Sequence, residues 1–318
     1  MAQKHPNQNT QEHSVDTSKP QDENFLLGVG MMLFSGLGFA LMNLFIRLSG
    51  PIPSMQKVFF RNLMVFIVSL LTLIHQQQKP AAKPLFQEKK DLGMLVFRSI
   101  LGTIGLLANF YAVDHLPLAN ASVLNKLSPF FTVIFSALFL KDRVNKAQVA
   151  GIICAFVGVI VLTRPVGMEM SWTMMLPILI AILGGIAAGA AYTTVRYLGQ
   201  RGMNGSFIIC FFAGFSVLVT APQLIFDYYP MTGKQVLYLV LVGISALAGQ
   251  YGITYAYRFA APPRISIFDY SSVLFSTLLG LFVLDQIPTA STIWGIVIIF
   301  AAFLIMFLYN RQLAKKKA

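Results

Sequence analysis

"SVLNKLSPFFTVIFSALFL", residues 122–140, is a long apolar stretch that contains one charged residue, Lys126. Its length is close to the roughly 20 residues that a helix needs to cross a bilayer. A lysine at the centre of a membrane helix costs about 2.5–3.5 kcal/mol on insertion scales, and more where it faces hydrocarbon alone. We therefore expect Lys126 to face a polar crevice between helices and not the lipid.

The composition of the whole chain indicates a membrane protein. Of its 318 residues, 56% are hydrophobic and only 11% are charged, and the mean hydropathy is +0.68. Backbone polar groups in lipid must bond within their own segment, which favours helices. We predict an all-α integral membrane protein with ten transmembrane helices. The expected spans are 25–46, 55–74, 92–113, 117–140, 147–163, 174–197, 207–226, 236–257, 263–284 and 293–309.

The net charge of +12 is distributed unevenly along these spans. If the N-terminus is cytoplasmic, 17 of the 24 basic residues fall in cytoplasmic loops and tails, and three fall in the opposite loops. This is the positive-inside pattern. It predicts a multi-pass protein of the cell membrane with both termini in the cytoplasm, and not a nucleic-acid binder. The polar residues 1–24 are expected to form a disordered tail, and residues 311–318 a basic tail.

The chain repeats itself at a fixed spacing. The segment that starts at Tyr111, "YAVDHLPLANASVLNKLSPFFTVIFSALFLKD", aligns without a gap on "YAYRFAAPPRISIFDYSSVLFSTLLGLFVLDQ", which starts at Tyr255, at an offset of 144. Nearer the start of each copy, Gly36 aligns with Gly185 at an offset of 149. These offsets predict two five-helix repeats, 25–166 and 167–310. Five is odd, so the copies enter the membrane from opposite sides, an arrangement typical of secondary transporters.

The repeated segment resembles a known family. The small-residue start of the first copy, its Pro129, its acidic Asp142 and the glycine-rich helix that follows are similar to the EamA-type unit of the drug/metabolite transporter superfamily. The second copy resembles this unit too, although Val273 replaces Pro129 and Gln286 replaces Asp142. The resemblance implies a ten-helix carrier of a small metabolite, with a central substrate cavity between the halves. Functional symmetry between the halves does not follow.

Polar residues share one helical face around Lys126, because residues three and four apart lie on the same side of a helix. At the equivalent positions of the second copy lie Asp269 and Tyr270. We expect the two stripes to meet across one cavity. One interpretation is that Lys126, Asn125 and Tyr270 bind an anionic group of the substrate. The alternatives are that Lys126 pairs with Asp269 to hold the halves together, or that one of the two carries a coupled proton.

Other polar side chains within the spans could line the same cavity. Arg61 and Arg98 would give it a positive potential that attracts anions, whereas Lys57 lies near a span end and could snorkel. The further predicted substrate-binding residues are Asp269, Arg61, Arg98, Asn43, Asn109, Tyr111 and Gln250, and additional candidates are Tyr192, Tyr251 and Tyr255.

These residues predict a secondary transporter that moves a small anionic or zwitterionic metabolite, such as an amino acid or nucleotide derivative, by alternating access. The alternatives are an exporter of cationic or neutral amphiphiles with Asp269 as counter-ion, or a receptor without transport. No phosphate loop, zinc-binding pair or nucleophile elbow is found, so no enzyme, metal or cofactor is expected. Cys154 and Cys210 are expected to be packing residues. The lipid bilayer, a coupled proton or a counter-substrate are the expected partners, and the oligomeric state stays open.

Overall fold

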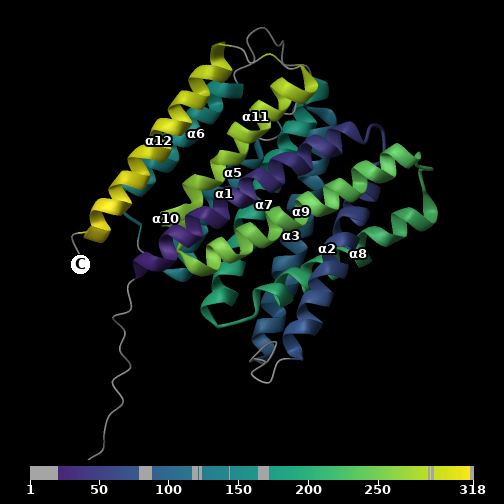
Figure 1. Cartoon of the computed structure of the whole chain (residues 1–318), viewed down its shortest axis with the longest axis horizontal. Helices are drawn as coiled ribbons and strands as arrows, with labels where there is room; N and C mark the ends of the chain where they lie inside the picture. The colour runs from purple at the N-terminus through teal and green to yellow at the C-terminus, as the bar shows by residue number, and fades with distance from the viewer. Residues whose placement is uncertain are drawn as a thin grey trace, which may run out of the picture.

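The computed structural model of the protein describes residues 21–78, 88–116, 121, 124–142, 144–163, 172–285, 287 and 290–315, and every regular element in these ranges is helical (Figure 1). The helices of the first half are α1 Gln21–Leu48, α2 Ser54–Gln77, α3 Lys89–His115, α5 Leu127–Phe135, the π-helical turn η1 Ser136–Leu140 and α6 Lys146–Thr163. Those of the second half are α7 Trp172–Gln200, α8 Gly205–Phe226, α9 Gly233–Phe259, α10 Pro262–Ile265, the 3₁₀ turn η2 Ser266–Tyr270, α11 Ser271–Leu284 and α12 Ala290–Lys315.

The predicted tails differ in part from these boundaries. Helix α1 already begins at Gln21, so residues 21–24 are helical and not disordered, and α12 continues to Lys315 through part of the predicted basic tail. The rest of both predicted tails, 1–20 and 316–318, lies outside the described residues.

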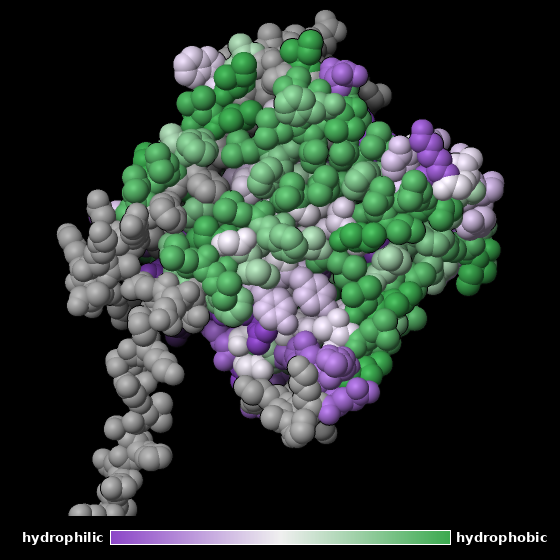
Figure 2. Space-filling model, in the orientation of Figure 1, coloured by the Kyte–Doolittle hydropathy of each residue, from purple (hydrophilic) through white to green (hydrophobic). Residues whose placement is uncertain are grey.

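Within the ranges that the structure describes, seven helices are long and apolar enough to cross a membrane. They are Phe25–Leu48, Ser54–Gln77, Lys90–His115, Met175–Gln200, Gly205–Phe226, Gly233–Phe259 and Ser266–Leu284. The other three predicted spans coincide with shorter apolar helices, Leu127–Leu140, Val149–Gly158 and Ile293–Ala302. Apolar side chains cover most of the face in Figure 2, and polar ones gather at its margins. Such an apolar surface fits lipid as the solvent, and the chain is an all-helical multi-pass membrane protein.

The helices of the two halves pack in reciprocal pairs. Helix α1 packs on α9, and its repeat counterpart α7 packs on α3. In the same way α5 contacts α7, and α11 contacts α1. Helix α2 packs on its counterpart α8, and α6 packs on its counterpart α12. Helices α6 and α12 lie side by side at one edge of the molecule (Figure 1). Each half therefore makes with the other the same contacts that the other makes with it.

The predicted continuous helix over 117–140 is interrupted at Lys126. Lys126 lies in a turn that caps α5 (φ −77°, ψ 8°), and Pro129 sits in the first turn of α5, where its missing N–H is tolerated. In a continuous helix Pro129 could not donate to Asn125 O, and its ring would clash with that carbonyl, so the helix is interrupted at Lys126 and begins again at Leu127. The second half is interrupted at the equivalent place, where Asp269 and Tyr270 end the 3₁₀ turn η2 before α11 begins.

Glycines bring the first helix of each half against the interruption of the other half. A Cβ added to Gly185 would lie 2.9 Å from Leu127 Cβ, and one added to Gly36 would meet Ser271 Oγ and lie 3.1 Å from Ser272 N. Leu127 and Ser271 are repeat equivalents at the offset of 144. Small residues allow this backbone approach, so the predicted alignment of Gly36 with Gly185 corresponds to the same packing contact, made twice.

Candidate functional site

A cavity lies where α1, α2, α3, α7, α8 and α9 meet the two interruptions. It leaves about 60 Å³ for the centres of water molecules, which is room for about four waters and too little for an organic metabolite. Its apolar wall is formed by side chains that include Phe39, Met42, Leu106 and Phe212. Its polar lining is formed by Asn43, Arg61, Arg98, Asn109, Asn125, Lys126, Ser128, Tyr192, Gln250, Asp269 and Ser272.

Eight of the ten predicted substrate-binding residues lie on this lining. They are Lys126, Asn125, Asp269, Arg61, Arg98, Asn43, Asn109 and Gln250. The structure places the other two elsewhere. Tyr270 is fully buried in an apolar cluster with Phe268 and Ile253, because the 3₁₀ turn directs its side chain into the core. Tyr111 stacks on His115 of its own helix, with ring centroids 4.0 Å apart.

Lys126 and Asp269 form an ion pair across the cavity. The Nζ atom of Lys126 lies 2.9 Å from Asp269 Oδ2, and the two side chains are 7% and 2% exposed. The other carboxylate oxygen, Oδ1, is buried and accepts no hydrogen bond from the described part of the chain. The pair therefore joins the two interrupted helices, as one of the alternatives predicted. A buried ion pair is by itself weak support for stability.

Two arginines enter the cavity and have no carboxylate partner among the described residues. Arg61 of α2 donates to Asn62 Oδ1 and, at 3.4 Å, to Gln250 Oε1, whereas Arg98 of α3 places Cζ 3.8 Å from the centre of the Phe212 ring. Both arginines are 1% exposed. Within the ranges that the structure describes, neither forms a salt bridge, and Arg61 Nε, Arg98 Nε and Arg98 Nη1 find no acceptor. The lining thus holds three cationic side chains and one carboxylate.

Three asparagines form a neutral polar strip between these charges. Asn125 Nδ2 donates to Asn109 Oδ1 at 2.7 Å, and Asn109 Nδ2 donates to Asn43 Oδ1 at 3.2 Å. The three amides come from the first interruption, α3 and α1. Because an amide can both donate and accept, this strip suits a polar part of a ligand that carries no charge.

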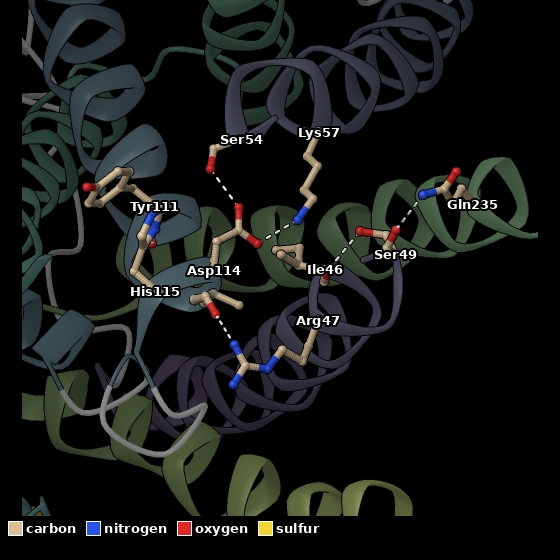
Figure 3. A network of polar contacts seen from close by, with 10 residues as sticks. Ile46, Arg47, Ser49, Ser54, Lys57, Tyr111, Asp114, His115 and Gln235 are labelled. Carbon is tan, nitrogen blue, oxygen red and sulfur yellow. Dashed lines mark hydrogen bonds and ion pairs between the residues drawn. The ribbon is translucent and has the colours of Figure 1, made fainter. Parts of the chain in front are cut away.

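Lys57 belongs to a separate network. Its Nζ lies 2.5 Å from Asp114 Oδ1, and Ser54 Oγ donates to the other carboxylate oxygen at 2.6 Å (Figure 3). Arg47 Nη1 of α1 donates to Val113 O at 2.9 Å beside them. Lys57 is 1% exposed, so it does not snorkel, and it is absent from the cavity lining. Its charge is neutralised within the first half.

The chain is similar to known proteins in sequence and in fold. A family model described as the EamA-like transporter family matches residues 25–164 and again residues 175–308. The chain belongs to the EamA-like transporter family. The two matches cover both halves, in agreement with the predicted repeat and with the predicted resemblance.

This EamA-like chain also has curated relatives along nearly its whole length. It is 29% identical over 288 residues to an uncharacterized transporter of Helicobacter pylori (strain J99), covering 88% of this chain and 94% of that protein. It is 28% identical over 277 residues to the pseudopaline exporter CntI of Pseudomonas aeruginosa (strain UCBPP-PA14), covering 86% and 94%. A solved crystal structure of a protein shares the fold with a TM-score of 0.71, at 19% identity over 92% of this chain and 99% of that one.

The residues of the cavity that sequence reasoning missed include Ser128, Ser272 and Phe212. Ser128 and Ser272 line it from repeat-equivalent positions, and Phe212 covers Arg98. The offset of 144 pairs the two serines and could have identified them. Nothing in the sequence distinguishes Phe212 from the many phenylalanines that face lipid.

Proposed function

We propose that this EamA-like protein is a secondary transporter that moves a small anionic or zwitterionic organic metabolite by alternating access. The observation that carries the proposal is the burial of Arg61 and Arg98 in the cavity without carboxylate partners. An unpaired charge inside the membrane is costly and its retention points to function. A carboxylate or phosphate of the substrate would supply the missing acceptors, and it fits the planar fork of a guanidinium.

The two-half architecture supports the transport cycle. We infer ten membrane helices arranged as two five-helix halves of opposite orientation, with both termini in the cytoplasm. The reciprocal contacts of the halves and the matched interruptions of α5 and α11 favour this arrangement. The cavity is too small for a metabolite as it stands, so the halves must move apart at one end to admit cargo. Gradients of the substrate, a coupled proton or a counter-substrate would drive the cycle.

The proposal is tested by flux and binding measured on matched variants. Purified protein in liposomes is assayed for uptake of labelled metabolites of each charge class, and the detergent-solubilised protein is screened for ligands that raise its melting temperature. We expect anionic or zwitterionic compounds to stabilise it, and Arg61→Gln and Arg98→Gln to reduce flux at least about tenfold, since hydrogen bonds to charged groups contribute about 1.5–3 kcal/mol. Lys234→Gln, which removes a cation outside the cavity, is the control. Saturable flux that survives both arginine substitutions would exclude the proposal.

A second candidate function is the export of cationic or neutral amphiphiles. It is favoured by the free Oδ1 atom of Asp269 and by the aromatic wall of Phe39, Tyr192 and Phe212. In that case organic cations stabilise the protein, and Asp269→Asn abolishes their effect while Arg98→Gln does not.

A further inference from the structure

The N-terminus of α3 holds a loop of the other half through charged side chains. Glu88 and Asp91 form a capping box at the start of α3. Arg201 lies in the loop between α7 and α8, and its Nε donates to Asp91 Oδ1 at 2.6 Å. Its Nη2 atom lies 2.8 Å from Glu88 Oε2. The Asp91 side chain is 2% exposed. One guanidinium of the second half therefore bridges two carboxylates of the first.

The equivalent contact at the other end of the molecule is made by neutral side chains. Thr232 and Gln235 stand at the positions of Glu88 and Asp91 and form the capping box of α9. Gln235 Nε2 donates to Ser49 O, in the loop between α1 and α2, at 3.2 Å (Figure 3). Ser49 and Arg201 each precede a glycine of positive φ, Gly50 (+73°) and Gly202 (+78°). The contact between a helix cap and the opposite loop is ionic at the Arg201 end and neutral at the Gln235 end.

Among the described residues, the other side-chain hydrogen bonds that join the halves at their ends are neutral. At the Arg201 end, Asn204 Nδ2 donates to Gln76 Oε1 at 2.8 Å. At the Gln235 end, Gln56 exchanges two hydrogen bonds with the backbone of Tyr229, at 2.8 and 3.0 Å. The ion pair of Lys57 also lies at the Gln235 end (Figure 3), but its partner belongs to the same half. Among the described residues, the ion pairs that join the halves at an end therefore lie at the Arg201 end.

We propose that Arg201, Glu88 and Asp91 form an ionic gate, which makes the transporter open less readily at the Arg201 end than at the Gln235 end. The inference rests on the alternating access of the proposed function. Opening at the Arg201 end separates a guanidinium from two carboxylates, and charge-assisted hydrogen bonds are roughly twice as strong as neutral ones. An arginine is charged at physiological pH, and side-chain hydrogen bonds to Glu88 and to Asp91 raise the pKa of Arg201 further. The positive-inside pattern puts this end in the cytoplasm.

The experiment measures from which face the cavity can be reached. Ser128→Cys places a thiol on the cavity wall in a background with Cys154→Ala and Cys210→Ala. Right-side-out and inside-out vesicles are treated with a membrane-impermeant methanethiosulfonate, and the two reaction rates are compared. We expect faster reaction from the Gln235 face. Arg201→Gln should lower the ratio of the rate from the Gln235 face to the rate from the Arg201 face. We expect a decrease of about three- to tenfold, because each ion pair that the substitution breaks is partly exposed to water. The matched control Gln235→Ala should not lower this ratio.

The outcomes separate the gate from the transport cycle. A rate ratio that is the same with and without Arg201→Gln would overturn the gate and leave alternating access intact. A thiol that reacts from one face only, in every variant, would overturn alternating access itself. Because Arg201→Gln could fail to fold, a second variant joins the same two segments by Arg201→Cys with Glu88→Cys. Oxidation of this pair should abolish reaction from the Arg201 face and reduction should restore it. Unchanged reaction in the cross-linked protein would also exclude the gate.

Discussion

Lys126 Nζ lies 2.9 Å from Asp269 Oδ2, and the residue that takes the position of Asp269 in the first half is Asn125, the neighbour of Lys126. The ion pair thus joins the interrupted helix of one half to the equivalent interrupted helix of the other. Its two residues stand at positions that differ by one in the repeat alignment. Each copy supplies one charge, so neither half neutralises its own. The pair depends on the two halves being together.

Removing one member of this pair should destabilise the protein more than removing both. Lys126→Met or Asp269→Leu alone leaves an uncompensated buried charge, at a cost of about 3–5 kcal/mol. The double substitution Lys126→Met with Asp269→Leu removes both charges and should recover most of that loss. Thermal unfolding in detergent measures the coupling as a double-mutant cycle. Wild-type flux in the double variant would show that Lys126 holds the halves together and binds no substrate.

Gly102→Ala should weaken anion binding without unfolding the protein. A Cβ at this position would lie 2.6 Å from Arg98 Nη1 and 2.9 Å from Phe212 Cε2. The guanidinium must then move from its place over the ring and lose a cation–π contact of about 0.5–2 kcal/mol. Gly93→Ala on the same helix is the control, since a Cβ there meets nothing within 4 Å. Equal ligand-induced shifts in melting temperature for the two variants would contradict this prediction.

Asp114→Asn should reduce stability and leave substrate affinity unchanged. It leaves Lys57, which is 1% exposed, without its carboxylate, at a cost of about 1–3 kcal/mol for an unsatisfied buried group. The affinity should persist because neither residue lines the cavity. The melting temperature and the ligand concentration for half-maximal stabilisation distinguish the two effects. A large change in affinity would place Lys57 on the substrate pathway.

Gly185→Ala should disturb the first interruption. The added Cβ would lie 2.9 Å from Leu127 Cβ and 3.3 Å from Leu124 O, and such overpacking costs about 1–3 kcal/mol. Gly30→Ala, where the space is open, should have no comparable effect. Thermal unfolding of the two variants compares them directly. Equal melting temperatures would mean that α7 does not hold this contact in the membrane.

Seven of the predicted spans and the repeat could be predicted from the sequence, because hydropathy and spacing act over many residues. The interruption at Lys126 depends on a few residues only. Pro129 predicts a local kink, but periodicity cannot tell a bent helix from one that stops and restarts. In the second half no proline stands at the equivalent position, where Val273 replaces it, and the 3₁₀ turn before α11 has no comparable signal.

The charged part of the site is readable because a charge in an apolar span is costly wherever it occurs. This is why Arg61, Arg98 and Asp269 can be selected without a structure. The position of Tyr270 cannot be read in this way. Successive residues advance by about 120° in a 3₁₀ turn and by about 100° in an α-helix, so a face drawn for a regular helix points Tyr270 in the wrong direction.

The packing of each first helix on the opposite half has a consequence for biogenesis. Helix α3, which carries Arg98, packs mainly on α7, and α1 packs mainly on α9. When the ribosome has released only the first half, the neighbours that enclose its intramembrane cations are still missing. The early helices can therefore reach their final packing only after the later ones are inserted. We expect a chain truncated midway to be recognised and degraded by membrane quality control.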